Sequence, residues 1–290
     1  MLIQVLISGL VIGCVYGLIA LGYSLIYKAS GLMSFAQGDM LTLGAFLGYM
    51  FYGQLKLPFV VSLVCVMLCM FGLGQLLERG IIRVLLKNNV LPVYIVLATI
   101  AISYIIQNAA MMIWGTQTLT FPPIFGSSLV ELFGVKVQPE AIFCIIMSVI
   151  CMLFLHVFMK YTRFGTAMRA AAMDPTAARA CGINTSFSTG VTWGLSAGVA
   201  ALGGMLLGPI YGVFTMLGAI IGRKGFSSAV IGGFGNMYGA MLGGILLGLI
   251  ETGTSAYVSS AYKDMISYSI LLIFLFVKPT GIFNEQAITE

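Results

Sequence analysis

The hydrophobic positions of this chain form long runs that are separated by short polar segments. A helix that crosses a bilayer needs about 20 consecutive, mostly apolar residues. The pattern predicts an all-α polytopic membrane protein with about eight transmembrane helices, and no polar segment between them is long enough to fold alone. We therefore expect a single domain over residues 1–290. The predicted helices are Leu2–Tyr27, Leu32–Tyr52, Pro58–Leu77, Val90–Trp114, Ala141–Met159, Phe187–Ile210, Phe226–Ile250 and Met265–Val277.

The composition excludes a soluble protein. Hydrophobic residues make up 60% of the chain and charged residues 8%, whereas soluble domains carry about 25% charged residues. The mean hydropathy is +1.05. The net charge of +5 is modest and does not indicate nucleic-acid binding. The first apolar run outlasts the apolar core of a signal peptide, so we expect a retained helix there.

Lysine and arginine concentrate in two of the polar segments. Residues 78–89 and 160–184 contain seven of them, whereas residues 115–139 contain only Lys136. Cytoplasmic loops of membrane proteins carry an excess of these residues. The first two segments are therefore expected on the cytoplasmic side and the third outside. Counting eight helices from these loops predicts both termini outside.

Glycines in the first and sixth predicted helices repeat with a constant offset of 181 residues. The two helices run in opposite directions in the predicted topology, as the halves of an inverted repeat do. Chance matching of two glycine-rich helices is the alternative. The matching residues are Gly9, Gly13, Gly17, Gly22 and Gly31 in the first set and Gly190, Gly194, Gly198, Gly203 and Gly212 in the second.

The segment Arg163–Asn184 is too polar to span a membrane. Asp174 is a good N-cap, Pro175 suits the first helical position, and Gly182 is a good C-terminal stop. These signals predict a short cytoplasmic helix, Pro175–Cys181. A helix with small side chains and a few arginines fits a groove on a partner protein, although a plain loop whose arginines only set the topology has the same composition.

The run Y-T-R-F-G-T-A-M-R-A-A-A-M-D-P-T-A-A-R-A-C-G-I-N at residues 161–184 resembles the coupling loop of the branched-chain amino acid ABC transporter permeases. Three further blocks are similar to that family: G-L-M-S-F-A-Q-G-D-M-L-T-L-G at Gly31–Gly44, the glycine-rich block at Phe226–Gly248, and the ending at Tyr262–Asp264 and Pro279–Ile282. This chain has Gln37 and Asp39 where many relatives have His and Glu.

The resemblance implies a permease subunit of an importer in the bacterial inner membrane, not an enzyme. Such permeases pair with a second homologous permease and two cytoplasmic ATPases, and an external binding protein delivers the substrate. ATP and Mg²⁺ are then expected on the ATPases, because this chain has no G-x-x-x-x-G-K-[ST] loop, and no cofactor or metal is expected here. The residues that would couple to the ATPases are Arg163, Gly165, Arg169, Asp174, Ala177, Ala178, Arg179 and Gly182.

The expected substrates are branched-chain or other hydrophobic amino acids, moved by alternating access, with urea and short amides as the alternative. A different class remains open, an ion-coupled secondary transporter. That class needs charges embedded in the membrane, and Asp39 and Glu251 are its candidates. Co-purification with ATPases would distinguish the two classes.

Two polar blocks are candidates for the substrate pathway. Ser34 and Gln37 have the spacing of a capping box, which predicts a helix start at Ser34. If this start lies within the membrane, its N–H groups could face a carboxylate and Asp39 an ammonium. A cytoplasmic helix start is the other interpretation. The second block is the glycine-rich block at Phe226–Gly248. Its glycines predict either a helix that is broken beside the pathway or close packing of helices through glycine. The candidate pathway residues are Ser34, Gln37, Asp39, Ser227, Ser228, Gly232, Gly233 and Asn236.

Isolated polar residues have simpler expected roles. Glu251 is expected at the membrane interface, Arg223 and Lys224 at a membrane boundary, and His156 as a packed or interfacial side chain. Gln107 in the fourth predicted helix either lines a polar path or bonds to a neighbouring helix. The six cysteines lie in or beside apolar stretches, without the spacing of a metal site or a disulfide framework.

Overall fold

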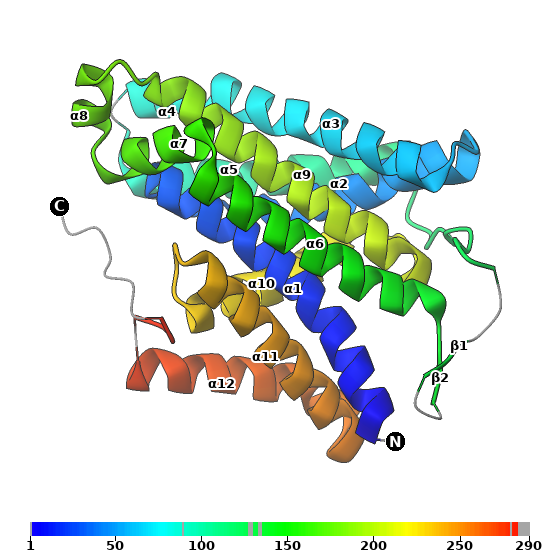
Figure 1. Cartoon of the computed structure of the whole chain (residues 1–290). Helices are drawn as coiled ribbons and strands as arrows, with labels where there is room; N and C mark the ends of the chain where they lie inside the picture. The colour runs from blue at the N-terminus through cyan, green and yellow to red at the C-terminus, as the bar shows by residue number, and fades with distance from the viewer. Residues whose placement is uncertain (1, 89, 127–129, 133–134, 279, 284–290) are drawn as a thin grey trace.

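The computed structural model describes residues 2–88, 90–126, 130–132, 135–278 and 280–283 (Figure 1). The first part comprises α1 (Leu2–Ser30), α2 (Gln37–Gly48) extended by a π-helical turn (Tyr49–Gln54), α3 (Phe59–Leu77) continued by a π-helical turn (Glu78–Ile82) into α4 (Arg83–Lys87), and α5 (Pro92–Trp114). A hairpin of β1 (Val130–Leu132) and β2 (Val135–Val137) leads to α6 (Pro139–Tyr161), α7 (Arg163–Met173) and α8 (Pro175–Ala180). The chain ends with α9 (Thr185–Tyr211), α10 (Leu217–Gly232), α11 (Met237–Tyr257), a 3-10 turn (Ser260–Tyr262) and α12 (Lys263–Val277).

The prediction of an all-α polytopic membrane protein is confirmed. Within the described residues, seven helical segments are long and apolar enough to cross a membrane, namely α1, α3 with α4, α5, α6, α9, α11, and α12 with the 3-10 turn before it. The helix α2, predicted as a full span, has only 12 residues and accounts for the difference from the predicted count. The resemblance block at Pro279–Ile282 falls partly outside the described residues, because Pro279 is not among them.

The helices form two inverted repeats, α1–α5 and α9–α12. α1 and α9 pack antiparallel, because Gly22 accepts a hydrogen bond from Ser196 (2.9 Å) while Gly203 lies beside Val15. The other helix contacts are equivalent in the two repeats. α1 packs along α11 as α9 packs along α3, and α2 packs against α5 as α10 packs against α12. The glycine offset in the sequence therefore reflects a structural repeat. α6, α7 and α8 connect the repeats.

The second helix of each repeat starts inside the bundle. Gly31 and Gly212 both have positive φ, +66° and +76°, and the chain turns back after each of them. The side chain of Gln37, at the start of α2, bonds to Ser196 beside Gly22. Gly22 precedes the end of α1 by eight residues, which is about 12 Å of helix. The start of α2 therefore lies well inside the end of α1, which favours a helix start within the membrane over a cytoplasmic one.

α2 and α10 cross where both backbones carry glycine. A Cβ added to Gly38 would meet the backbone of Gly218 and would lie 2.9 Å from Gly222 Cα. The backbone N–H of Gly218 donates to Thr42 Oγ1 (2.8 Å). Only glycine permits an approach this close, since any Cβ would force the helices apart. The crossing brings the two half-helices together at the local axis that relates the repeats.

The predicted helix Phe226–Ile250 is two helices in the structure. α10 ends at Gly232, Gly233 and Gly235 have φ of +104° and +90°, and α11 begins after Asn236. Asn236 Oδ1 accepts hydrogen bonds from the N–H groups of Tyr238 (3.0 Å) and Gly239 (3.1 Å), which caps α11. Of the two interpretations of this block, the broken helix is the one present here. The single predicted helix ran through the break because the apolar run continues, while the positive-φ glycines reverse the backbone.

This break changes the predicted topology. α11 crosses the bundle once more, so α12 runs back toward the end at which α8 lies, and Ile282 N donates to Ile231 O (3.0 Å). The described ends of the chain, Leu2 and Phe283, therefore lie at opposite ends of the bundle (Figure 1). The prediction that both ends lie on the same side is wrong for these described ends, because α10 turns back inside the bundle and does not run its full length.

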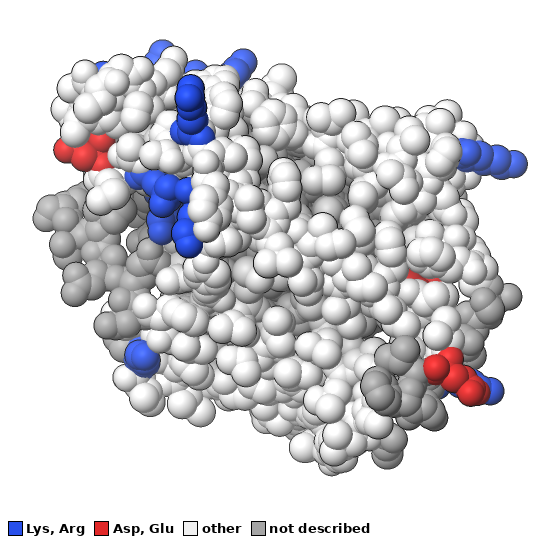
Figure 2. All heavy atoms as spheres, viewed as in Figure 1, with Lys and Arg blue, Asp and Glu red and all other residues white. Residues whose placement is uncertain are grey.

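Charge distribution supports the predicted sidedness. Figure 2 shows Lys and Arg side chains gathered at the end of the bundle formed by α7 and α8, while the central band has almost no charge. Large apolar side chains are exposed midway along the spanning helices, such as Leu68 (65%) on α3, Ile105 (65%) on α5 and Leu153 (58%) on α6. Such a surface suits lipid or another apolar partner. The end with α7 and α8 is thus the cytoplasmic end.

Candidate functional site

A cavity of about 480 Å³ lies at the crossing of the two half-helices. Its walls come from α2, α5, α10 and α12, so both repeats contribute to it. The close approach at Gly38 and Gly218 positions these walls, because it fixes α2 and α10 at backbone contact. Non-helical backbone before each half-helix is tolerated at this depth where it is buried in protein or lines a cavity.

One wall carries a carboxylate. Asp39 lies in the first turn of α2, where the helix dipole stabilises negative charge, and it is 2% exposed. Its side chain accepts hydrogen bonds from Ser103 Oγ and from Gln107 Nε2 (3.0 Å), both on α5. These bonds compensate part of the cost of burying the charge. A carboxylate can accept about four hydrogen bonds, so Asp39 keeps capacity for a cationic group in the cavity.

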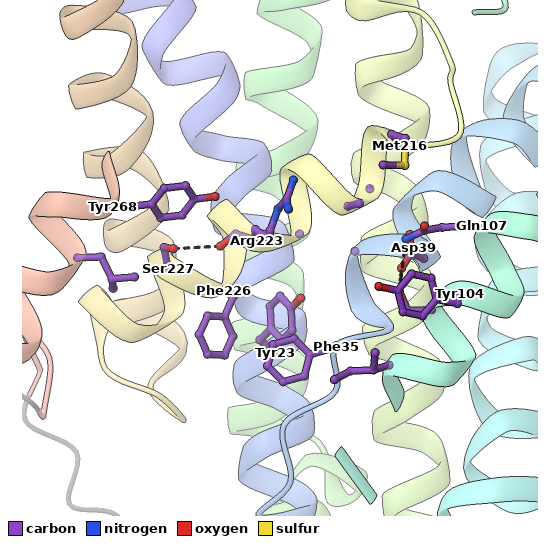
Figure 3. A pocket seen from close by; sticks show the side chains of 17 residues that line it. Tyr23, Phe35, Asp39, Tyr104, Gln107, Met216, Arg223, Phe226, Ser227 and Tyr268 are labelled. Atoms are coloured by element: carbon purple, nitrogen blue, oxygen red, sulfur yellow. Dashed lines mark hydrogen bonds between the residues drawn. The ribbon is translucent and has the colours of Figure 1, made fainter. Parts of the chain in front are cut away.

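The opposite wall carries a cation. Figure 3 shows Arg223, Ser227 and Tyr268 on one side of the cavity and Asp39 with Gln107 on the other. Ser227 Oγ donates to the carbonyl of Arg223 (3.0 Å) and so stays bound to its own helix. The cavity thus presents groups of opposite charge on facing walls, an arrangement that suits a small molecule with both an ammonium and a carboxylate.

Aromatic rings separate the charged walls. Phe226 contacts Tyr23 and Phe35 with ring centroids 5.7 and 5.5 Å apart, and it also contacts Phe234 at 5.4 Å. Phe234 in turn lies against Tyr27 (5.2 Å), near the cytoplasmic end of α1. Figure 3 shows Tyr23, Phe35 and Phe226 between Arg223 and Asp39. They form an apolar surface against which an aliphatic side chain can pack.

The predicted pathway residues divide into two groups. Asp39 and Ser227 line the cavity. The other six have structural positions. Gln37 Nε2 donates to Ser196 O (3.0 Å), Ser228 Oγ donates to Lys224 O (2.8 Å), and Asn236 caps α11. Gly232 packs against the backbone of Gly239, and Gly233 forms the break after α10. Ser34 is buried, with no hydrogen-bond partner for its hydroxyl among the described residues.

The predicted capping box is wrong. α2 begins at Gln37 with Ala36 at the N-cap position, and no side chain caps it. Gln37 points instead toward Gly22 and Ser196, because tertiary contacts with α1 and α9 offer its amide a backbone carbonyl. The sequence also gave no reason to select Tyr23, Phe35, Tyr104 or Tyr268, which line the cavity. Gln107 was a candidate, and its bond to Asp39 is both interhelical and at the cavity wall.

The predicted short cytoplasmic helix is confirmed within one residue as α8. Asp174 Oδ1 accepts from the N–H groups of Thr176 (2.8 Å) and Ala177 (3.0 Å), and Gly182 has a φ of +81°. The preceding polar segment forms the additional helix α7, capped by Thr162, whose Oγ1 accepts from Gly165 N (3.0 Å). The loop is therefore a pair of short helices, each with an N-cap.

The predicted coupling residues do not all lie on the outer face of this pair. Arg163, Arg169, Ala177 and Arg179 are exposed. Ala178 is only 5% exposed and accepts a hydrogen bond from Ile183 N (3.0 Å). Ala178 thus faces its own protein, since one face of a short helix must pack against the chain that carries it, while the neighbouring Ala177 is exposed. Gly165 is buried, because a Cβ there would lie 2.5 Å from Phe158 O at the turn after α6.

A buried charge cluster connects α10 with α11 and α12. Glu251 and Lys224 pair directly, and Lys224 also pairs with Asp264 (2.7 Å). Tyr16 Oη donates to Glu251 Oε2 (2.8 Å). The expected interfacial positions of Glu251 and Lys224 are wrong, because they are 4% and 3% exposed. Their mutual pairing makes the burial possible. Arg223, in contrast, is exposed and lines the cavity.

His156 is half-buried and bonds to a tyrosine. Tyr238 Oη lies 2.7 Å from His156 Nδ1, and the two rings are tilted with centroids 4.9 Å apart. This pair joins α6 to α11. The expectation of a packed or interfacial histidine agrees with this contact.

Known proteins resemble the chain over nearly its whole length. It is 32% identical to the high-affinity branched-chain amino acid transport system permease protein LivH of Escherichia coli (strain K12), over 99% of this chain and 97% of the relative. It is 31% identical to the corresponding BraD protein of Pseudomonas aeruginosa, with the same coverage. The structure of PsaBC from Streptococcus pneumoniae in complex with a Fab has a similar fold, with a TM-score of 0.51, 13% identity, and coverage of 94% of this chain and 91% of that chain.

The family described as branched-chain amino acid transport system / permease component matches residues 5–275. The multi-pass fold and the length of the match agree with this assignment, and they place the chain in the inner membrane. The chain therefore belongs to the family of branched-chain amino acid transport system permease components.

Proposed function

We propose that this chain forms half of the translocation unit of an ATP-driven importer for branched-chain amino acids. A second permease, two cytoplasmic ATPases and an external binding protein complete the assembly. The relatives are named as branched-chain amino acid permeases, which supports this substrate class. The chain transports and does not hydrolyse ATP, so ATP and Mg²⁺ belong to the ATPases.

The observation that carries the proposal is the cavity at the crossing of α2 and α10. It offers a carboxylate at Asp39, a guanidinium at Arg223 and aromatic rings at Phe35 and Phe226. A branched-chain amino acid has an ammonium, a carboxylate and an aliphatic side chain, so each part has a chemical counterpart. Buried polar groups at membrane depth are costly and mark substrate paths by default.

A mechanical connection joins the cytoplasmic surface to this cavity. α8 is followed by the N-cap Asn184, whose Oδ1 accepts from Phe187 N (3.0 Å) and starts α9. α9 packs along α2, which carries Asp39. ATPase closure against α7 and α8 would move α9 and with it the wall that holds Asp39. The cavity would then open alternately to the two sides of the membrane.

The ATPase contact involves the exposed face of α8. Ala177 permits close approach, and Arg169 on α7 and Arg179 on α8 are exposed on the same pair of helices. The Asp174 cap and the turn at Gly182 keep this helix short and rigid. A rigid helix transmits a displacement, whereas a flexible loop would absorb it.

The test is uptake by the complete assembly in proteoliposomes, with ATP inside and the binding protein outside. Leucine uptake should require all partners, and urea should not compete. Ala177→Trp should leave ATP hydrolysis in place while leucine uptake falls at least tenfold, and Ala177→Ser at the same position should behave as the wild type.

Two results would contradict the proposal. Leucine uptake by the permease alone, driven by an ion gradient, would identify a secondary transporter. ATP-driven uptake of urea without leucine would keep the machine but change the substrate.

A further inference from the structure

A second cavity, of about 280 Å³, lies on the other face of α10. Ile220, Ile221 and Lys224 line this cavity, whereas Ala219, Gly222 and Arg223 line the candidate pathway. α10 therefore forms a wall between two spaces. Tyr211, at the end of α9, and Lys263, at the start of α12, also line the second cavity. Both positions lie toward the end of the bundle opposite α8, so the cavity belongs to the external half of the membrane.

The walls of the second cavity are apolar except at one end. Val15, Leu207 and Leu217 represent the apolar part. The polar end contains the side chains of Lys224, 4% exposed, and Glu251, 5% exposed. Ligand pockets combine a mostly apolar lining with a few fixed polar groups. At about 280 Å³ this one is below the roughly 300–1,000 Å³ that hold drug-sized ligands, so it suits a molecule of a few heavy atoms.

Among the charged groups at this end, the contact between Lys263 and Glu251 is the weak one. Glu251 Oε1 pairs with Lys224, and Oε2 accepts from Tyr16. Lys263 Nζ is 3.8 Å from Glu251 Oε1, longer than the 2.7–2.9 Å of a charge-assisted hydrogen bond. The Lys263 side chain is 40% exposed. An ammonium against Glu251 and a carboxylate against Lys263 would replace this weak contact with two short ones.

The balance of charge selects the type of ligand. The buried charges at this end are those of Lys224 and Glu251, which balance each other, whereas Lys263 and Asp264 are partly exposed. A lone anion or a lone cation would add an unbalanced charge beside this buried pair, which is costly at low dielectric. A zwitterion brings one charge of each sign and preserves the balance. The apolar walls then favour a zwitterion with an aliphatic side chain.

We propose that the cavity bounded by Tyr16, Ile220, Lys224, Glu251 and Lys263 is an external acceptor site for an amino acid with an apolar side chain. The site receives substrate on the external side of α10 before it enters the cavity that contains Asp39. Lys263 binds the substrate carboxylate and Glu251 the ammonium. This inference rests on the proposed function, because it assigns a second binding position for the same substrate class.

The first experiment measures binding of radiolabelled leucine to the purified permease–ATPase assembly without the binding protein. It uses an Ala219→Phe background, which fills the pathway cavity on the opposite face of α10. Unlabelled leucine should compete at least tenfold better than isovalerate, which lacks the ammonium, or isoamylamine, which lacks the carboxylate. Lys263→Gln should weaken leucine binding about tenfold or more and leave isoamylamine binding unchanged. Lys56→Gln, another lysine at the external end, is the matched control.

The second experiment compares two neighbouring substitutions. The assembly with Ala219→Phe should still bind leucine at the acceptor site. Adding Ile220→Phe fills that site and should abolish this binding. Both positions are at least partly exposed, so the variants should fold, as gel filtration of the assembly will check. A purely structural role for Lys263 predicts equal losses for leucine and isoamylamine, and that result would overturn the inference.

Failure of this inference is distinguishable from failure of the proposed function. ATP-driven leucine uptake by the wild-type assembly tests the function. If that uptake is present, and Lys263→Gln and Ile220→Phe bind leucine as well as the Ala219→Phe assembly without them, the acceptor site is refuted and the function stands. If the wild-type assembly neither takes up nor binds leucine, both proposals are refuted.

Discussion

The two half-helices α2 and α10 have equivalent places in the inverted repeats but different chemistry. α2 directs its charge, Asp39, into the pathway cavity, where α5 supplies Ser103 and Gln107. α10 carries two adjacent cations, and Arg223 lines the same cavity while Lys224 points away to Glu251 and Asp264. The shared feature is the glycine crossing.

This difference shows which parts of the repeat the backbone constrains. The crossing requires glycine at Gly38 and Gly218, because no Cβ fits between the helices. The charged side chains are less constrained, because each needs only a nearby partner. α5 provides hydrogen-bond donors for Asp39, and α11 provides a carboxylate for Lys224. The two halves of one architecture can therefore bind opposite ends of an asymmetric molecule.

The largest effect is expected from breaking the ion pair of α10. Lys224→Met leaves Glu251 buried without its main partner, which should lower the free energy of unfolding by about 3–5 kcal/mol. Thermal unfolding of the purified assembly measures this loss. The double variant Lys224→Met with Glu251→Leu should recover most of it, because it removes both buried charges. A single variant as stable as the wild type would show that the pair is not needed for the fold.

A smaller loss is expected from widening the glycine crossing. Gly38→Ala places a Cβ against Gly218 and 2.9 Å from Gly222 Cα, and overpacking of this kind costs about 1–3 kcal/mol. Gly72→Ala is the control, since nothing lies within 4 Å of a Cβ there. The same thermal measurement applies to both. Equal stability of the two variants would mean that the helices separate without cost.

Asp39→Asn tests the charge on the α2 side. The amide keeps the size of the carboxylate but cannot pair with an ammonium, so leucine uptake should fall roughly tenfold, the equivalent of about 1.4 kcal/mol. Ser227→Ala on the facing wall is the control and should change uptake little, because Ser227 Oγ bonds to its own helix. Uptake at the wild-type rate in Asp39→Asn would remove Asp39 from the pathway.

The smallest effect is expected from the partner of Asp39. Ser103→Ala removes one hydrogen bond to the carboxylate and leaves that of Gln107 in place. The loss in the free energy of unfolding should be about 1 kcal/mol, and leucine uptake should fall less than in Asp39→Asn. A larger loss of uptake than in Asp39→Asn would indicate that Ser103 itself contacts the substrate.

Local signals in the sequence were sufficient for part of this structure. The apolar runs predicted the long helices, and Asp174, Pro175 and Gly182 predicted α8 within one residue. Both depend on interactions between neighbours in the chain, which composition and spacing record. The glycine offset also predicted the repeat, because close helix packing demands small residues wherever it occurs.

Contacts between distant residues decided the rest. Ser34 and Gln37 have the spacing of a cap, yet Gln37 bonds to Ser196, 159 residues away. Glu251 lies near a predicted helix end, yet Lys224 and Tyr16 bury it. The sequence by itself determined the membrane class, the cytoplasmic helix and the repeat, because these follow from hydrophobicity and local backbone preferences. Only the tertiary structure decided where charges lie and which way the last helix runs, because a buried charge is stable only beside a partner that folding brings to it.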